Sequence, residues 1–577
     1  MCGIFVCGKR ESDVPGEVIQ DELLPLVHNR GPDGYSDCTV RFLSWQINFW
    51  GSVLWMQGQM PELQPVKDEK GNVLLWNGDI FDGPWVPVDG RSDTRVVLER
   101  IFGSNCMPEN ILLSISSIKG PYSFVYWCES TQMLWFGRDH IGRHSLLCYF
   151  EDNHSFILTS VGKRNLPFIE VPVVGIFVID FSKEFFNLTV YPWSDTSEME
   201  LHNLQNWPIP IRVSELIVKS PIQAKCPEPY SPSAEYSQII TEAVVTRCIF
   251  DALLSQTVVS DKVEQLLHCL RKAVMIRTKT HPGKCRNCLK DNMVLQSNVG
   301  ECSHPKIGIL FSGGLDSTVI AALAHESIPP HDSIDLFNVA FENQSKSLQN
   351  SPHFHTPDRT TGFQSSKELQ SIFPQRRWNF IQINVSREEL NNFRKTRIGD
   401  LIHPLVSILD DSLGCALWFA CQLRGILGDS EYSSPARILL LGMGADEQFG
   451  GYMRHRTTLR HRGWSALAEE VDVELQRIAT RNLGRDDRIV GDHGCQARFP
   501  FLDEDVINFV GTLPIWKRCY PSCELPPGFG DKLILRLAAW KLGLKNAAVI
   551  PKRAFQFGSR IANSKEKATD VSSRLML

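Results

Sequence analysis

Hydrophobic residues in the first third of the chain gather in short runs that polar turns separate. The clearest runs lie at 73–76, 122–128, 133–136 and 156–159. Their length and their content of aromatic and β-branched residues are typical of buried strands. This part of the chain is therefore predicted to form antiparallel β-sheets.

A different pattern governs the C-terminal half. Apolar runs at 307–311, 334–341, 378–385 and 438–441 alternate with stretches of helical periodicity, such as 318–325. This alternation favours a parallel sheet covered by helices. Between the two patterns the chain is rich in proline and then becomes helix-like at 263–277. We predict a first domain at 2–185, a linker at 186–262 and a second domain at 263–565.

Composition narrows the class of protein. The chain has 577 residues, a formal net charge of −5 and 17 cysteines. No basic stripe is present to neutralise phosphates, so we expect no nucleic-acid partner. No apolar run approaches 18 residues and no secretory signal is evident, so we expect no membrane partner and a reducing, cytoplasmic location.

Cys2 is the first candidate for chemistry. Once Met1 is removed, this residue carries both a thiol and a free α-amino group, and the amine can accept the thiol proton and return it to a leaving group. The alternative is a cysteine that merely begins a buried strand. The neighbouring motifs help to decide between a catalytic and a purely structural Cys2.

Asn77 and Gly78 end the apolar run at 73–76. A side-chain amide and an unobstructed backbone N–H are the donors that stabilise an oxyanion when a thiolate attacks an amide. A two-residue hairpin turn is an equally good interpretation of Asn-Gly. Further on, Asp93 follows Ser92 and could hold a substrate ammonium.

The motifs MCGIF, RGPDG, WNGDIF, RSD and GRDHIG follow one another over residues 1–142. In order and spacing they resemble a class II glutamine amidotransferase domain. The resemblance implies an N-terminal-nucleophile (Ntn) hydrolase fold, an αββα sandwich that hydrolyses glutamine to glutamate and ammonia. It implies that Cys2, Asn77 and Gly78 are catalytic, and that Asp79 and Asp93 bind glutamine.

One position departs from that pattern. Where such domains carry an arginine that pairs with the glutamine carboxylate, this chain has Val53. A bidentate arginine–carboxylate contact is a strong interaction, so its loss weakens glutamine binding unless another cation replaces it. Arg30 or another basic residue is the candidate replacement.

A second set of motifs begins with SGGLDS at 312–317, between the apolar run at 307–311 and a helical stretch. Backbone N–H groups, hydroxyls and a helix N-terminus favour a bound anion there. The loop resembles the pyrophosphate loop of the ATP pyrophosphatases. That resemblance assigns ATP binding to Ser312, Gly313, Gly314, Asp316 and Ser317.

Another glycine-rich turn, GMGADEQFGGY at 442–452, follows the run at 438–441. Asp316 and Asp446 would then face the same pyrophosphate and supply the carboxylates that magnesium prefers beside phosphate oxygens. Lys552 precedes a polar loop. Without its context, a lone lysine is most simply a solvated surface charge.

The order SGGLDS, GADEQFGGY, ARFPFLD, PKRAFQF resembles the synthetase domain of glutamine-dependent asparagine synthetases, and the whole chain most resembles the asparagine-synthetase-like members of that family. The resemblance implies a Rossmann-like parallel α/β domain that uses ATP, magnesium and aspartate, together with ammonia that the first domain releases from glutamine. Lys552 would stabilise the acyl-adenylate, Leu310 and Val339 would contact adenine, and Gly442 would lie near the nucleotide. A homo-oligomer is compatible with the sequence.

The second domain also departs from the family. Met443 stands where these enzymes have a glutamate near the acyl-adenylate, and a thioether cannot accept a proton. The stretch 408–421 is apolar where they use polar residues for aspartate. Two alternatives therefore stay open, an amidotransferase with another carboxylate acceptor and a non-catalytic scaffolding or binding protein.

Cys285, Cys288, Cys302 and His304 precede the ATP loop with spacings C-x2-C and C-x-H. Four such ligands can form a structural zinc site. The second spacing is unusual for zinc, and a polar insertion without a metal is the other interpretation.

Overall fold

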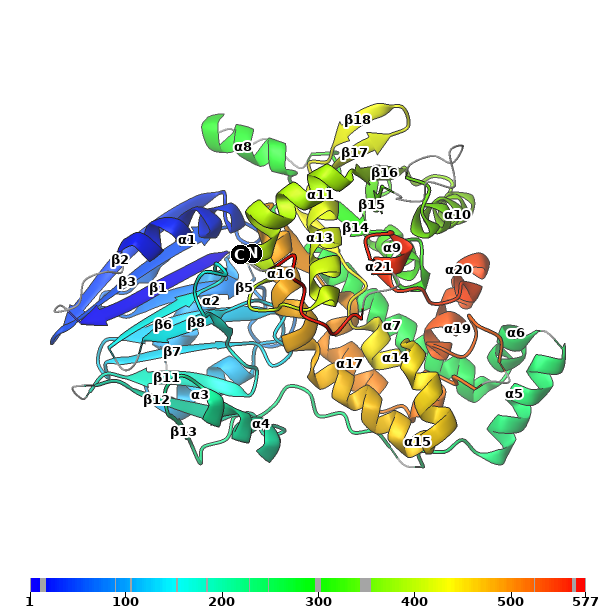
Figure 1. Ribbon diagram of the computed structural model, residues 1–577, viewed down its shortest axis with the longest axis horizontal. Coiled ribbons are helices and arrows are strands. Elements are labelled where there is room, and N and C mark those ends of the chain that lie inside the picture. The colour runs from blue at the N-terminus through cyan, green and yellow to red at the C-terminus, as the bar shows by residue number, and fades with distance from the viewer. Residues whose placement is uncertain are drawn as a thin grey trace.

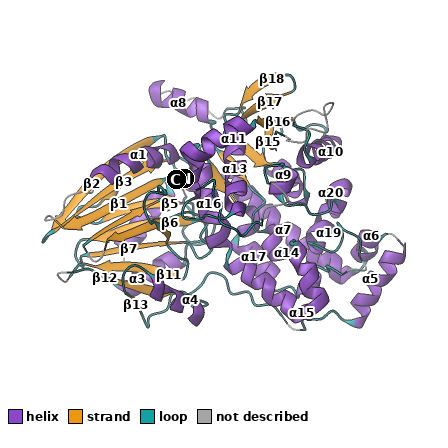
Figure 2. Ribbon diagram, viewed as in Figure 1, coloured by secondary structure: helices purple, strands orange, loops and turns teal. Residues whose placement is uncertain are grey.

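The computed structural model describes residues 2–10, 17–88, 90–103, 106–151, 154–182, 185–227, 229–246, 248–295, 302–342, 354–522, 525–562 and 567–575. The β-rich part, built from the first 213 residues, lies on the left of Figure 1, and a part rich in helices lies on the right. Figure 2 shows the same division by secondary structure.

Two sheets form the N-terminal part. The first has six strands in the order β10 (Ile169–Glu170), β8 (Leu147–Glu151), β9 (Ser155–Thr159), β1 (Gly3–Arg10), β3 (Trp45–Val53), β2 (Gly34–Phe42). The second has seven in the order β13 (Ile211–Val213), β12 (Asn187–Pro192), β11 (Gly175–Asp180), β7 (Met133–Arg138), β6 (Tyr122–Cys128), β5 (Val73–Gly78), β4 (Val66–Lys67). The strands predicted between residues 73 and 159 are confirmed.

The two sheets pack face to face. Val6 and Phe49 of the first sheet share a buried core with Val125 and Phe136 of the second. On the outer faces, α1 (Glu17–Arg30) covers the first sheet, and α2 (Asp93–Phe102) and α3 (Pro108–Ser116) cover the second. Strands β12 and β13 continue the second sheet beyond residue 185, where the sequence had placed the start of a linker.

The third sheet carries the C-terminal half. Its order is β18 (Ser430–Ser433), β17 (Arg424–Leu427), β16 (Trp378–Val385), β15 (Ile334–Phe341), β14 (Ile307–Leu310), β19 (Ile438–Leu440), β20 (Gln496–Arg498). Five neighbouring strands run parallel to one another, namely β16, β15, β14, β19 and β20. Strands β17 and β18 add an antiparallel edge. The predicted parallel sheet is therefore present.

Helices cover both faces of this sheet. One face packs against α7 (Thr257–Lys279), α9 (Leu315–Ser327) and α19 (Leu533–Lys541), and the other against α13 (Ile408–Cys421) and α16 (Gly484–Gly491). The other α-helices of the described ranges are α4 (Glu198–Asn203), α5 (Ala234–Thr246), α6 (Ile249–Leu254), α8 (Arg286–Leu295), α10 (Pro357–Ile372), α11 (Arg387–Phe393), α12 (Gly399–Ile402), α14 (Ala445–Phe449), α15 (Met453–Gln476), α17 (Glu504–Gly511), α18 (Ile515–Arg518), α20 (Lys545–Val549) and α21 (Phe555–Gly558).

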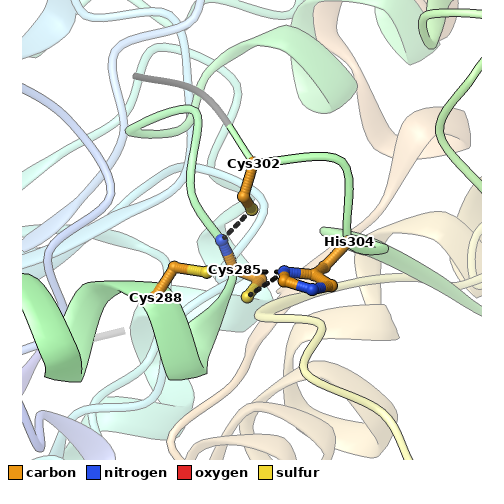
Figure 3. A group of neighbouring side chains, drawn as sticks. All are labelled: Cys285, Cys288, Cys302 and His304. Atoms are coloured by element: carbon orange, nitrogen blue, oxygen red, sulfur yellow. Dashed lines mark hydrogen bonds between the residues drawn. The ribbon is translucent and has the colours of Figure 1, made fainter. Parts of the chain in front are cut away.

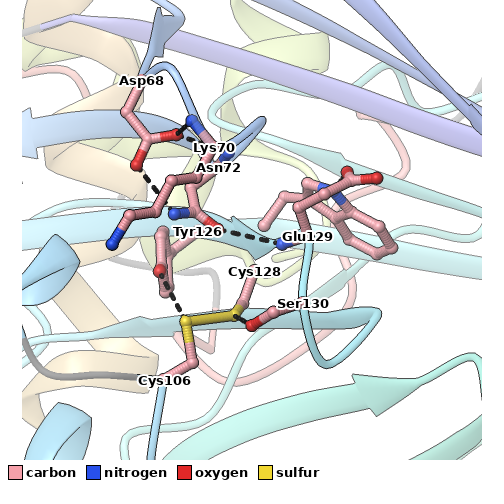
Figure 4. The surroundings of a disulfide bond; sticks show 9 residues. Asp68, Lys70, Asn72, Cys106, Tyr126, Cys128, Glu129 and Ser130 are labelled. Atoms are coloured by element: carbon pink, nitrogen blue, oxygen red, sulfur yellow. Dashed lines mark hydrogen bonds between the residues drawn. A yellow bond between two sulfur atoms is a disulfide. The ribbon is translucent and has the colours of Figure 1, made fainter.

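A disulfide between Cys106 and Cys128 ties the turn after α2 to β6 (Figure 4). Beside it, Asn72 donates to the carboxylate of Asp68 and accepts the backbone N–H of Glu129. The sequence had not singled out this cysteine pair. Within the described ranges, no helix is both long and apolar enough to cross a membrane.

Candidate active sites

Cys2 directly precedes β1 and lies beside the end of β5. Its backbone N–H donates to Asn77 Oδ1 at 2.8 Å, and its carbonyl accepts from Arg30 Nε at 3.3 Å. Burial raises the pKa of the Cys2 thiol, and this effect outweighs a hydrogen bond from the backbone of Leu54. The thiol therefore needs a nearby base if it is to act as a nucleophile at neutral pH.

Asn77 and Gly78 do not form a hairpin turn, so that interpretation of the sequence is wrong. Both belong to β5 and pair with Ser123 and Tyr122 of β6. A Cβ atom on Gly78 would lie 2.6 Å from the indole of Trp76 and 2.8 Å from a backbone carbonyl. Side-chain crowding by that indole, rather than a turn conformation, requires glycine at this position.

A pocket adjoins Cys2. Its lining includes Asn77, Gly78, Asp79 and Asp93, so the structure brings together the residues predicted for this site. These residues lie at or next to the start of β1, the end of β5 and the N-terminus of α2, so the pocket is found where these two strands end.

The pocket is acidic. Glu62, Asp79 and Asp93 line it, and among the described lining residues none is lysine, arginine or histidine. Asp93 accepts the indole N–H of Trp76 at 2.9 Å and the backbone N–H of Thr94 at 2.8 Å. Burial, reinforced by the charge of Asp79, raises the pKa of Asp93 to about 7.

No cation in this lining can pair with a substrate carboxylate. Val53 is buried at the pocket wall, where the family pattern calls for arginine. Arg30, the candidate replacement, is 1% exposed and pairs with Asp487 of α16 at 2.7 Å. Its charge is therefore already neutralised, and the expectation that it compensates for Val53 is wrong in this structure.

Asp79 links this pocket to the C-terminal half. Its carboxylate accepts from Gln57 at 2.8 Å and from Gln496 of β20 at 2.6 Å. Arg498, also on β20, lies 3.5 Å from the same carboxylate, and burial lowers its pKa to about 10. Sequence reasoning missed Gln496 and Arg498, because only tertiary structure places β20 behind the pocket.

The second candidate site lies where β14 ends and α9 begins. Residues 312–314 form the connecting loop, and Gly313 adopts a φ of +77°. A Cβ atom on Gly313 would lie 2.5 Å from the backbone of Gly362, so only glycine fits there. The Ser312 hydroxyl accepts the N–H of Gly314 at 3.3 Å, and Ser317 donates to the carbonyl of Gly314 at 3.3 Å.

Charged residues alternate in sign beside this loop. Lys532 donates to Asp316 at 2.7 Å and forms an ion pair with Asp446 at 2.7 Å, and Lys552 pairs with the other oxygen of Asp446. Burial acts to lower the pKa of Lys532, but the two carboxylates outweigh it and raise that pKa above its usual value. Burial likewise acts to raise the pKa of Asp446, and the two lysines outweigh it and lower that pKa.

Lys532 was not predicted. It is 2% exposed, whereas a lysine ahead of an apolar helix normally indicates a solvated charge. Asp316, Asp446 and Lys552, which were predicted, do come together around it. A Cβ atom on Gly442 would lie 3.1 Å from the Asp316 Cβ, so this glycine lets the two loops approach closely.

The remaining predicted residues surround this cluster less directly. Leu310 is half-buried at the carboxyl end of β14, and Val339 is 1% exposed within the core of β15. Met443 is half-buried and packs against the same core as Val339. Contacts of Leu310 and Val339 with adenine stay predictions.

Comparison with known proteins identifies the family of this chain. The family described as asparagine synthase matches residues 302–467 and 457–564, the part that holds the cluster around Lys532. Asparagine synthetase domain-containing protein 1 from mouse is 39% identical to this chain, and the human protein of that name is 38% identical. The alignments cover all of this chain, with 100% of the mouse and 98% of the human protein. The chain belongs to the asparagine synthetase domain-containing protein 1 family.

A more distant relative carries an enzyme name. A protein of Methanocaldococcus jannaschii described as a putative glutamine-hydrolysing asparagine synthetase is 28% identical over 210 residues, which cover 36% of this chain and 33% of that protein.

Proposed function

We propose that this chain is a glutamine- and ATP-dependent ligase that forms an amide, with aspartate as acceptor and asparagine as product. The observation that carries the proposal is the alternation of Asp316, Lys532, Asp446 and Lys552 beside the glycine-rich loop at 312–314. Two half-buried carboxylates and two ammonium groups beside an anion-binding loop suit a magnesium pyrophosphate.

The fold supports the same assignment. Two antiparallel sheets between helices, with Cys2 at the first strand, suit an Ntn-hydrolase glutaminase. A helix-covered parallel sheet with its loops at the carboxyl ends of β14 and β19 suits a Rossmann-like ATP pyrophosphatase. We place the boundary between the two at the segment after β13.

The residues present fit magnesium. Asp316 and Asp446 already share one cation, the Lys532 ammonium, at 2.7 Å each, so their oxygens lie close enough to serve a common divalent ion. When bound with ATP, magnesium would neutralise charge on the pyrophosphate leaving group. Lys532 then has phosphate oxygens as replacement partners for the carboxylates.

In the proposed first step, an aspartate carboxylate oxygen attacks the α-phosphorus of ATP, and pyrophosphate leaves with the electron pair of the broken P–O bond. Loop N–H groups at 312–314 and the N-terminus of α9 face the phosphates. Lys552 donates to the oxygens that gain charge at the α-phosphorus. Ammonia then attacks the acyl carbon, and AMP leaves.

Ammonia comes from the pocket at Cys2. The thiolate attacks the glutamine amide carbon, ammonia leaves after taking a proton, and water hydrolyses the thioester. Asn77 accepts the N–H of residue 2 through Oδ1, and its amide nitrogen donates to Ser123 at 3.4 Å. A carboxamide carries two N–H donors, so Asn77 has a second one for the oxyanion. The step requires removal of Met1.

A second acceptor is the specific alternative. Met443 cannot assist ammonia attack as a glutamate would, and the acidic pocket offers no cation for a substrate α-carboxylate. Both features suit a carboxylate acceptor other than aspartate or a nitrogen donor other than glutamine. A non-catalytic role on the same fold is the third possibility.

Pyrophosphate release tests the proposal. The natural chain, with Met1 removal verified by mass spectrometry, is supplied with magnesium ATP, aspartate and ammonium. We expect aspartate-dependent release that Asp316→Asn abolishes. Release with other carboxylic acids alone would select the second acceptor. Absence of both release and ATP binding would select the non-catalytic role.

A further inference from the structure

Three thiols and one imidazole meet between the start of α8 and the segment that precedes β14, outside both sites described above (Figure 3). Cys285 directly precedes α8 and Cys288 lies in its first turn, while Cys302 and His304 belong to the segment that leads into β14. The four potential ligand atoms all lie within 4.8 Å of one another. None of the three cysteines is in a disulfide.

The distances suit a shared cation. His304 Nδ1 lies 3.6 Å from Cys285 Sγ and 3.4 Å from Cys288 Sγ. A tetrahedral zinc ion with ordinary Zn–S and Zn–N bonds separates such atoms by about 3.5 Å. One ring nitrogen offers a single lone pair or a single hydrogen, so it cannot bond fully to both sulfurs. A metal ion between them satisfies all three atoms.

Cys302 completes the set. Its sulfur accepts the backbone N–H of Cys285 at 3.1 Å, a hydrogen bond that orients this ligand. Three thiolates and one imidazole select a soft, tetrahedral metal and leave no open position for a substrate. We infer that Cys285, Cys288, Cys302 and His304 bind a structural zinc ion.

Contacts around the cluster indicate which elements of the fold the zinc ion would hold together. Arg286 donates to the carbonyls of His493 and Gly494, at 2.9 and 3.0 Å, in the loop after α16. Lys306 donates to the carbonyl of Cys302 at 2.6 Å and pairs with buried Asp332 at 2.7 Å. Because β14 begins at Ile307, the ion would fasten α8 to the strand that leads into the ATP loop.

Metal content tests this inference. The full chain, expressed without a histidine tag, is purified and analysed by elemental mass spectrometry beside Cys288→Ser, His304→Ala and Cys248→Ser. Cys248 is an exposed free cysteine outside the cluster and serves as a matched control. We expect one zinc per chain in the natural protein and Cys248→Ser, and a more than tenfold loss in the two cluster variants.

A second measurement uses only the natural chain and therefore tests the inference even when the cluster variants do not fold. Cobalt is exchanged into the natural full chain, and the absorption spectrum is recorded. Sulfur-to-cobalt charge-transfer bands and intense tetrahedral d–d bands are the expected result. Zinc that persists unchanged in both cluster variants, iron in place of zinc, or a natural chain that takes up neither zinc nor cobalt while its thiols are reduced would each overturn the inference.

Discussion

Arg30 and Asp487 form a buried ion pair between the two halves of the molecule. Arg30 Nη2 lies 2.7 Å from Asp487 Oδ2, and the two side chains are 1% and 0% exposed. The same guanidinium donates to the carbonyl of Cys2, while Asp487 also accepts from His144 at 2.7 Å and from the backbone of Ser145 at 3.0 Å. One helix of the C-terminal half thus fixes the residue that carries the candidate nucleophile.

Breaking this pair should destabilise the whole chain. Asp487→Asn keeps the shape but leaves Arg30 charged and buried without a counter-ion, and such a loss costs about 3–5 kcal/mol. Urea unfolding measures it. Arg30→Met combined with Asp487→Asn removes both partners and should recover part of the loss. Equal losses in the single and double variants would contradict the role assigned to the pair.

The two lysines of the second site should differ in their structural importance. Lys532 is 2% exposed between two carboxylates, so Lys532→Met should cost about 3–5 kcal/mol of unfolding free energy. Lys552 is 22% exposed and pairs with Asp446, so Lys552→Met should cost about 1 kcal/mol. Magnesium should restore stability to Lys532→Met by replacing the lost cation. Similar losses in both variants, or no effect of magnesium, would argue against the described cluster.

Sequence patterns predicted the strands that face a core. The runs at 122–128, 334–341 and 378–385 match β6, β15 and β16 in both bounds. Strands β6 and β15 are buried along their whole length, and β16 alternates half-buried and buried residues, so each presents a continuous apolar face to a core. Strand β13 escaped notice, since it is short and largely exposed at a sheet edge.

Residues of the candidate sites were predictable only where a short sequence motif determines the local backbone conformation by itself. The glycines of the loop at 312–314 are such a case. Lys532 and Asp487 were not predictable, because a buried charge is identified by a partner that is distant in the sequence. The hairpin turn that the sequence offered for Asn77-Gly78 was wrong. The same dipeptide occurs in hairpin turns and, in this protein, at the end of a strand where an indole ring crowds the glycine.

Asp93 should make stability depend on pH. Its pKa is raised to about 7, above the unfolded value, so the folded state holds the proton more tightly. This contribution is present at low pH and is lost as the pH rises through 7. Relative to Asp93→Asn, the natural chain should lose about 2–3 kcal/mol between pH 5 and pH 8. Urea unfolding at several pH values measures the difference, and a constant difference would contradict the raised pKa.

Val53→Arg should improve glutamine binding. The new guanidinium would enter a pocket that contains three carboxylates and no cation, and it would supply the missing partner for the glutamine carboxylate. We expect at least a tenfold gain in kcat/KM for glutamine hydrolysis, with Val53→Met as the control for side-chain volume. An unchanged KM in a folded Val53→Arg protein would show that the ligand of this pocket is not an α-amino acid bound in the usual orientation.

Transfer of isotope tests the central claim most directly. The natural chain, with Met1 removed, is incubated with magnesium ATP, aspartate and glutamine labelled with ¹⁵N at the amide, and the products are identified by mass spectrometry. The account predicts ¹⁵N-labelled asparagine together with AMP and pyrophosphate. It predicts that Cys2→Ala forms asparagine only from ammonium, and that Asp316→Asn forms none. Glutamate released without any labelled amide product, or no reaction in a chain shown to bind ATP, would contradict it.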